Sequence, residues 1–386
     1  MDFGLSPEEQ AFKQEVVAFF DRELKPEVIE ELATGNGPGP ATKAFYQLLG
    51  SKGWLTINWP KKYGGLDGTC VQRLIVTEEL AYRRAFYTMV GPAMAGPTIL
   101  LVGSEEMKEE FLPRIARCEI DFALGYTEPD AGSDLASLDI RAVEDGDYYV
   151  INGQKMFNTD CHYADYHWLG ARTDPTVSKH KGISLFVVDL KSPGIEIRPI
   201  YVLDGMRTNV VYYEDVRVPK RNLVGMPNMG FYYIATALDF ERVLPVGDFR
   251  RDFEDLLDCV KRLSRDGVPL ARDPLVRQRL AESAIEVEAA WLLAFRIAWM
   301  IDRQIVPNHE ASMLKMYVTE AYQRLGLAAH QILGPLGQLV DGSQRVPAGG
   351  RFSQLYLNSF IRTVAGGTSE IQRTVIALRG LGLPRK

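Results

Sequence analysis

The stretch YTEPDAGSD, residues 126–134, guides the interpretation of this chain of 386 residues. It places turn formers, carboxylates and hydroxyls between an apolar region and a region with strand-like runs. Its Pro, Gly and Asp residues fix a turn, which leaves hydroxyls and backbone N–H groups free to meet a polar ligand. On composition alone, the stretch is an ordinary loop between a helix and a strand.

The segments on either side of this loop have different patterns. Residues 1–121 are predicted to be helical, and SPEE at 6–9 is a strong helix start with Ser as N-cap, Pro at N1 and Glu at N3. Residues 122–225 hold short β-branched and aromatic runs, which predict strands of a small antiparallel barrel or sandwich at 148–151, 183–188, 195–200 and 210–213.

From residue 226 to 386 the pattern is helical again, and Asp273-Pro274 opens a long helix that runs to about Gln304. Helices of that length belong to bundles and often to oligomer interfaces. We therefore predict an α+β chain with an N-terminal helical domain, a central β domain and a C-terminal four-helix bundle.

Composition narrows the class of protein. The net charge is -6 and there is no basic patch, which argues against nucleic acid as a partner. Four cysteines and five histidines show no spacing typical of a metal site or a disulfide framework. No apolar run is long enough to span a bilayer, and the acidic start MDF does not resemble a targeting segment. We expect a cytoplasmic protein.

The loop at 126–134 resembles the flavin and acyl-thioester loop of the acyl-CoA dehydrogenase family. The resemblance implies that Tyr126 and Thr127 meet the flavin, and that Ser133 meets FAD or the thioester arm of CoA. The stretch NGQKMFNT at 152–159 is similar to a family strand. There, Phe157 would pack near the flavin, in place of the commoner Trp, and the Thr159 hydroxyl would bind flavin N5. Taken alone, Phe157 would be a core aromatic residue.

A third stretch, GGTSEIQR at 366–373, also resembles the family. Its two glycines allow close backbone approach, and its hydroxyl residues open a helix whose first N–H groups can hold an anion. The resemblance places FAD against Thr368 and Glu370. The segment QILGPLG at 331–337 looks like the one that reaches a neighbouring subunit's FAD, through Gln331 and Gly334.

The usual catalytic base is missing. Many family members carry a Glu immediately before Gly-Thr of the third stretch, where this chain has Gly366 after Ala365. A subset places the base in a Leu-Asp-x-Glu-Arg pattern, which LDFER at 238–242 matches. The resemblance makes Glu241 the base and Arg242 a substrate contact, and Gly366 keeps the N–H that stabilises the thioester oxygen. Taken alone, Glu241 would be a solvated helix charge.

Two departures shape the expected substrate and assembly. The small pair Ala365-Gly366 leaves space beside the thioester, so we expect a branched, cyclic or bulky acyl group, with Ser133, Arg242 and Ala365 contacting it. Family members have an Arg-x-x-Phe-Gly stretch, but the corresponding residues 262–267 of this chain contain no Phe. Pro274 occupies the position of a Gln that touches FAD in the family. Part of the FAD site between subunits is therefore expected to be rebuilt or weak.

The resemblance predicts α,β-dehydrogenation of an acyl-CoA thioester with FAD as cofactor. A carrier-protein thioester in place of CoA stays open, and an electron-transfer flavoprotein is the expected electron acceptor. We expect a homotetramer or a heterotetramer. The alternatives are a flavin-dependent oxidase or monooxygenase on the same fold, and an FAD-poor structural partner subunit of a heteromeric enzyme.

Overall fold

Helix α1 (Pro7–Glu23) begins at the predicted capping box. The Ser6 N–H donates to Glu9 Oε2 (2.7 Å) and the Glu9 N–H donates to Ser6 Oγ (3.2 Å), so two unpaired donors of the first turn are satisfied. The computed structural model describes residues 4–87, 89–241, 245–343 and 345–384, and gives the backbone alone for 238–241.

The chain forms two compact units, which we describe separately. The mixed unit comprises residues 19–69 and 87–241, and the helical unit comprises residues 1–18, 70–86 and 242–386. The mixed unit contains α2 (Pro26–Ala33), α3 (Pro40–Ser51), α5 (Gly96–Val102), α6 (Glu105–Ala116) and α7 (Gly230–Glu241). Its strands are β1 (Phe122–Gly125), β2 (Arg141–Asp145), β3 (Tyr148–Lys155), β4 (Tyr166–Arg172), β5 (Ile183–Asp189), β6 (Ile195–Tyr201) and β7 (Arg207–Pro219).

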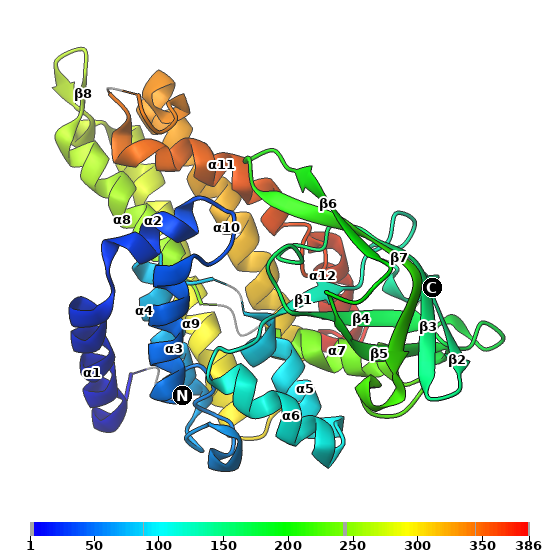
Figure 1. The fold of residues 1–386 in the computed structure, drawn as a ribbon. Coiled ribbons are helices and arrows are strands. Elements are labelled where there is room, and N and C mark those ends of the chain that lie inside the picture. The colour runs from blue at the N-terminus through cyan, green and yellow to red at the C-terminus, as the bar shows by residue number, and fades with distance from the viewer. Residues whose placement is uncertain (1–3, 88, 242–244, 344, 385–386) are drawn as a thin grey trace. The chain divides into compact units, whose positions relative to one another are not determined.

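These seven strands form one sheet in the order β1-β4-β2-β3-β7-β6, with β5 paired to β4 (Figure 1). The pairs β2–β3, β3–β7, β6–β7 and β4–β5 are antiparallel, as predicted. Strand β1 instead runs parallel to β4, because the chain between them crosses the sheet through the 126–134 loop, β2 and β3. The α+β class predicted from the sequence is confirmed, and the parallel pairs β1–β4 and β2–β4 are exceptions inside the β domain.

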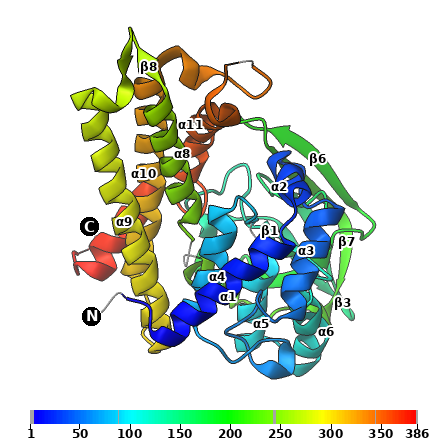
Figure 2. The same ribbon diagram turned by 90° about the vertical axis from the view of Figure 1, so that its left-hand side faces the viewer.

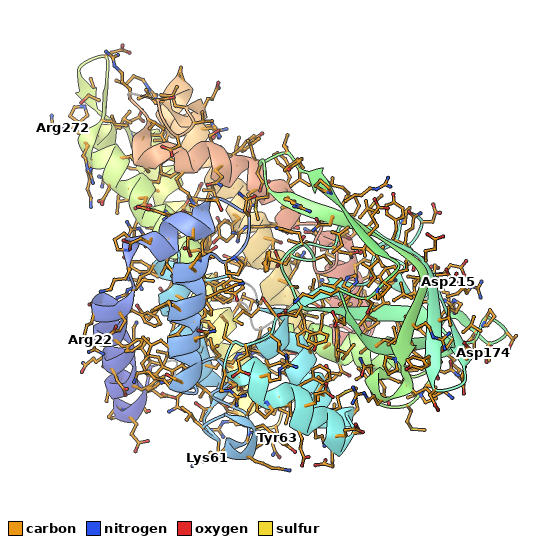
Figure 3. The ribbon with its side chains drawn as sticks, in the orientation of Figure 1. Arg22, Lys61, Tyr63, Asp174, Asp215 and Arg272 are labelled. Atoms are coloured by element: carbon orange, nitrogen blue, oxygen red, sulfur yellow. The ribbon has the colours of Figure 1, made fainter. Side chains whose placement is uncertain are left out.

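The pairing of β3 with β7 carries a bulge between Ile151 and Gly153. At the bulge, the Asn152 side-chain amide donates to Asp215 Oδ1 (3.0 Å), and the Asp215 N–H donates back to Asn152 Oδ1 (2.9 Å). Asp215, labelled in Figure 3, has a left-handed backbone with φ 49°. The bulge bends these strands and increases their local twist.

Helix α7, which ends at Glu241, packs on β5. Its first residue, Gly230, lies so close to the β5 backbone that an added Cβ would approach the Ser184 carbonyl carbon to 2.5 Å. Only glycine permits this approach without a shift of helix or strand. The start of α7 is therefore fixed on the sheet.

The helical unit contains α4 (Cys70–Tyr82), α8 (Gly247–Arg262), α9 (Pro274–Asp302), α10 (His309–Leu333), α11 (Arg351–Arg362) and α12 (Ser369–Val375). A short hairpin, β8 (Ser264–Arg265) with β9 (Val268–Pro269), connects α8 to α9. Helices α8, α9 and α10 lie side by side in Figure 2, and α11 packs along α10, which gives the predicted four-helix bundle. Helix α4 packs against α8 and α9.

Helix α9 opens as predicted, because the Asp273 carboxylate accepts a hydrogen bond from the Leu275 N–H (2.9 Å) and Pro274 occupies N1.

Across the described part of the chain, we find no helix that combines the length and the apolar character needed to cross a bilayer.

Candidate active site

The loop 126–134 leaves the end of β1 and closes on itself within the mixed unit. The Glu128 N–H donates to Ala131 O (3.0 Å), and the Ala131 N–H donates to Glu128 O (3.2 Å). Tyr126 is buried, Thr127 is half-buried and Ser133 is exposed. The loop therefore anchors one end in the core and presents Ser133 at the surface.

A buried ion pair holds this loop. The Lys155 side chain at the end of β3 is 0% exposed, and its ammonium donates to Tyr126 O and to Glu128 Oε1, each at 2.9 Å. The Glu128 carboxylate also accepts the N–H groups of Asp139 (2.6 Å) and Ile140 (3.1 Å). Burial lowers the pKa of Lys155 to about 8, against the opposing effect of Glu128. Lys155 thus ties β3 to the start of the loop, and Glu128 ties that start to the residues that follow the loop.

The second predicted stretch lies beside the loop, since the Met156 N–H donates to Thr127 O (2.9 Å). Phe157 follows with a left-handed backbone (φ 58°), and the residue is 55% exposed. A left-handed backbone is uncommon for an aromatic residue and marks a constrained position. In this unit Phe157 is therefore a surface residue and does not belong to the core.

Asn158 and Thr159 fix the chain around Phe157. The buried Asn158 amide donates to Leu124 O (2.9 Å), and its backbone N–H donates to Asn209 O (2.9 Å). The Thr159 hydroxyl lies 3.1 Å from the Thr208 hydroxyl. An exposed aromatic ring held next to hydroxyl groups fits a flat conjugated ligand with polar edges.

Behind this stretch lies a buried chain of polar groups. His167 Nδ1 hydrogen-bonds the Tyr213 hydroxyl, and His167 Nε2 lies 3.4 Å from Cys161 Sγ. Burial lowers the pKa of His167 to about 3, so the ring is neutral at physiological pH. All three side chains are buried in the mixed unit. Among the described residues, no cluster of His, Cys, Asp and Glu could hold a metal ion.

The third predicted stretch lies in the helical unit, between α11 and α12. Gly366 and Gly367 both have left-handed backbones, with φ 67° and 91°. Thr368 is the N-cap of α12, and its hydroxyl accepts a hydrogen bond from the Ile371 N–H (3.2 Å). Glu370 is exposed, and its own backbone N–H and the Thr368 hydroxyl lower its pKa. The stretch is a glycine turn followed by a capped helix.

A pocket of about 560 Å³ opens beside this turn. Glu320 and Arg373, which form an ion pair on its wall, contact each other at 2.7 Å. The pocket thus combines a charged wall with the start of α12. Its lining comes from α10, the end of α11 and α12, and comprises Glu320, Gln323, Arg324, Leu327, Thr363, Val364, Ser369, Glu370 and Arg373.

The remaining predicted residues are distributed as follows. Gln331 is exposed near the end of α10, and Gly334 ends that helix with φ 58°. Ala365 is exposed in the turn before Gly366. Glu241 is the last residue of α7, but its side chain and all of Arg242 lie outside the described residues.

Sequence reasoning did not assign roles to Lys155, Glu128, Lys315 or Gln372. Lys155 ends a strand at an inward-facing position, and Lys315 falls on the apolar face of α10 between Leu314 and Val318. In both cases a charged residue occupies a position that the hydrophobic periodicity assigns to the core. That mismatch is the sequence signal that could have identified Lys155 and Lys315.

Comparison with known families identifies the family of this chain. Three family models match: acyl-CoA dehydrogenase N-terminal domain at residues 6–119, middle domain at 123–216 and C-terminal domain at 228–381. The chain is 37% identical to acyl-CoA dehydrogenase FadE29 of Mycobacterium tuberculosis (strain ATCC 25618 / H37Rv), over 100% of this chain and 99% of that protein. The chain belongs to the acyl-CoA dehydrogenase family.

Solved structures agree with this assignment. A structure described as the Tcur3481-Tcur3483 steroid ACAD has a TM-score of 0.92 at 34% identity, and each chain is covered completely. The ChsE4-ChsE5 complex from Mycobacterium tuberculosis has a TM-score of 0.91 at 34% identity, again with complete coverage of both chains.

As an acyl-CoA dehydrogenase, the protein is an FAD-dependent oxidoreductase that acts on acyl-CoA thioesters. The exposed Phe157 ring beside the Thr159 hydroxyl fits the ring system of this cofactor. When bound, FAD supplies the oxidant that accepts a hydride, and with it two electrons, from the substrate.

Proposed function

We propose that this acyl-CoA dehydrogenase oxidises a bulky, branched or cyclic acyl-CoA to its 2-enoyl-CoA. The observation that carries the proposal is the open space at Gly366. A Cβ added there would meet, among the described residues apart from its chain neighbours, only Lys315 Cε, at 3.9 Å. Ala365 beside it is small and exposed, so neither side chain fills the space next to the thioester.

The name of a similar structure gives independent support for the bulky acyl group. That protein is described as a steroid ACAD, and a steroid is a fused-ring group far wider than a straight acyl chain. Family resemblance assigns Ser133, Arg242 and Ala365 to the substrate. It assigns Tyr126, Thr127, Phe157, Thr159, Gln331, Gly334, Thr368 and Glu370 to FAD.

In the proposed reaction Glu241 removes the α-proton of the thioester. The electrons of the Cα–H bond form the Cα–Cβ double bond while the β-hydrogen leaves as hydride to the oxidant that bound FAD would supply. The products are the enoyl thioester, a protonated Glu241 and the cofactor reduced by two electrons. The Gly366 N–H stabilises negative charge on the thioester oxygen as it develops. An electron-transfer flavoprotein is the proposed final acceptor.

The test is a panel of thioesters with an artificial electron acceptor in place of the protein acceptor. The panel contains butanoyl-CoA, 2-methylpropanoyl-CoA, cyclohexanecarbonyl-CoA, 3-phenylpropanoyl-CoA and a CoA thioester of a steroid carboxylic acid. We expect kcat/KM to be greatest for a branched or cyclic member. A clear preference for butanoyl-CoA would overturn the proposal, and turnover of a carrier-protein thioester alone would reassign the thiol carrier.

The role of Glu241 has its own test. Glu241→Gln keeps the size of the side chain but removes the base, and we expect turnover to fall by roughly 10²–10⁴-fold with FAD still bound. Glu27→Gln, a change at an exposed carboxylate of α2 that the proposal assigns to neither FAD nor substrate, is the comparison. If Glu241→Gln retained full activity, another group would be the base.

We also propose that the protein works in a heteromeric assembly. Pro274 cannot donate a side-chain hydrogen bond to FAD, and it lies at the exposed start of α9. Two similar structures carry paired names, Tcur3481-Tcur3483 and ChsE4-ChsE5, and the second is described as a complex. A second kind of chain would complete the cofactor site.

A further inference from the structure

The Gly366–Gly367 turn has unusually strong support from one buried cation. Lys315 of α10 is 4% exposed, and its ammonium donates to Gly367 O at 2.6 Å. A charge-assisted hydrogen bond of this length is stronger than one between neutral groups. The lysine therefore restrains the peptide plane that follows Gly367.

A buried amide adds two more contacts to the same turn. Gln372 of α12 is 0% exposed, and its Nε2 donates to Gly366 O (3.1 Å) and to Gly367 O (3.2 Å). Upstream, the Ala365 N–H donates to Ile361 O (2.9 Å) at the end of α11. The turn is thus fixed from both directions.

Such support has a physical reason. Glycine has the greatest backbone freedom of any residue, so two glycines in succession would sample many conformations without outside partners. At the same time, a buried ammonium is costly to desolvate, and an apolar side chain such as Met would fill the α10 position at less cost. The lysine is therefore a poor choice for stability alone.

We propose that Lys315 is a positioning residue, which holds the Gly366–Gly367 turn so that the Gly366 N–H faces the thioester oxygen. The inference rests on the proposed function, in which that N–H stabilises the developing negative charge. The ammonium also places positive charge beneath the turn, where a low local dielectric strengthens its effect. Gln372 assists by holding the Gly366 carbonyl.

The experiment compares three single variants of the full-length holoenzyme. Lys315→Met removes the ammonium, and Lys315→Arg keeps the charge. The matched control is Thr319→Val, one turn along α10, whose buried hydroxyl bonds Lys315 O (2.8 Å) and does not touch the turn. Two quantities are measured: amide hydrogen exchange of residues 365–371, and kcat with KM for the best thioester of the panel.

We expect Lys315→Met to lower kcat by about 100-fold, the effect of losing one oxyanion donor, with KM changed by less than about twofold. Amide hydrogen exchange at residues 365–371 should be faster in Lys315→Met than in the wild type. Lys315→Arg should retain most of the wild-type kcat, and Thr319→Val should match the wild type in both exchange and kcat. Equal kcat values for Lys315→Met and Thr319→Val would overturn the inference. An increase in KM with unchanged kcat in Lys315→Met would also overturn it.

Two further results distinguish a failure of the proposed function from a failure of the Lys315 inference. If the wild type holds FAD but turns over no thioester, the proposed function fails, and hydrogen exchange still decides whether Lys315 holds the turn. If Lys315→Met does not fold, Gln372→Met removes the other donor and is measured in the same way. It should lower kcat by about tenfold, and an unchanged kcat in that variant would count against the inference.

Discussion

At the scale of single residues, the Lys155–Glu128 pair yields a direct prediction. Lys155→Met leaves the Glu128 carboxylate buried without its ammonium, so we expect the free energy of unfolding to fall by about 3–5 kcal/mol and FAD to dissociate more readily. Urea unfolding and flavin fluorescence measure the two effects. The control is Lys179→Met, since the exposed Lys179–Asp134 pair on the same loop (2.6 Å) should contribute less than about 1 kcal/mol.

His167 predicts how stability depends on pH. Burial lowers the pKa of His167 from 6.5 to about 3, so below pH 6.5 the unfolded state binds a proton that the folded state does not. Stability is therefore lost as the pH falls from 6.5 toward 3, by about 1.4 kcal/mol per pH unit for this one group.

His167→Gln removes that proton difference. We expect the stability lost between pH 6.5 and 5 to shrink by about 2 kcal/mol in this variant, measured by urea unfolding at both values. Cys161→Ala, which keeps the histidine and removes only its sulfur neighbour at 3.4 Å, should retain the wild-type pH dependence. Parallel curves for wild type and His167→Gln would contradict the account.

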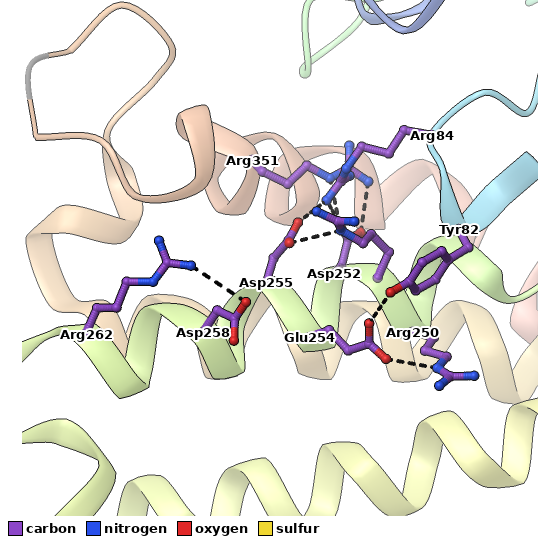
Figure 4. A network of polar contacts seen from close by, with 10 residues as sticks. Tyr82, Arg84, Arg250, Asp252, Glu254, Asp255, Asp258, Arg262 and Arg351 are labelled. Atoms are coloured by element: carbon purple, nitrogen blue, oxygen red, sulfur yellow. Dashed lines mark hydrogen bonds and ion pairs between the residues drawn. The ribbon is translucent and has the colours of Figure 1, made fainter. Parts of the chain in front are cut away.

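At the scale of helices, an ion-pair network joins the segment after α4 to α8 and α11 (Figure 4). Asp252 of α8 is 0% exposed and binds Arg351 through two contacts of 2.8 Å, and Arg84 at 2.9 Å. Burial raises the pKa of Asp252, but Arg351 and Arg84 outweigh burial and leave it below its ordinary value. The carboxylate therefore stays charged and joins three segments.

Asp252→Asn should destabilise the helical unit by roughly 3–5 kcal/mol, because two arginines lose a buried counter-charge. Thermal unfolding measures the loss. Asp258→Asn on the same helix is the matched control, since its contacts with Lys261 and Arg262 are exposed and should contribute less than about 1 kcal/mol. Similar melting temperatures for both variants would show that the buried Asp252 ion pairs stabilise the helical unit no more than the exposed pairs of Asp258 do.

Elements with clear local signals were predictable from the sequence. The capping box at Ser6 and the Asp273-Pro274 start mark α1 and α9, and β-branched runs mark β3, β5, β6 and β7. Strands β1, β2 and β4 were not predicted. Strand β4 (YHWLGAR) contains no β-branched residue, whereas the equally buried β5 (ISLFVVD) contains three.

The site was predictable only in part. The stretches at 126–134, 152–159 and 366–373 carry turn chemistry visible in the sequence. Lys155 and Lys315 support these stretches through hydrogen bonds to residues 27 and 52 positions away in the sequence. No local sequence pattern encodes contacts over such separations. The assignments of Glu241 and the FAD contacts stay predictions, as does the division of the chain at 121 and 225.

At the scale of the whole molecule, the proposed loss of an FAD contact at Pro274 predicts how much cofactor the protein retains. The chain purified without a partner should hold clearly less than one FAD per chain, measured from flavin and protein absorbance with mass by light scattering. Pro274→Gln should raise FAD affinity about tenfold or more, the effect of one hydrogen bond to a charged group. Leu275→Gln, at the exposed neighbouring position, is the control and should leave affinity unchanged. One tightly bound FAD per chain in a homomeric wild-type assembly would refute the heteromeric proposal, and would mean that α9 holds the cofactor through residues other than position 274.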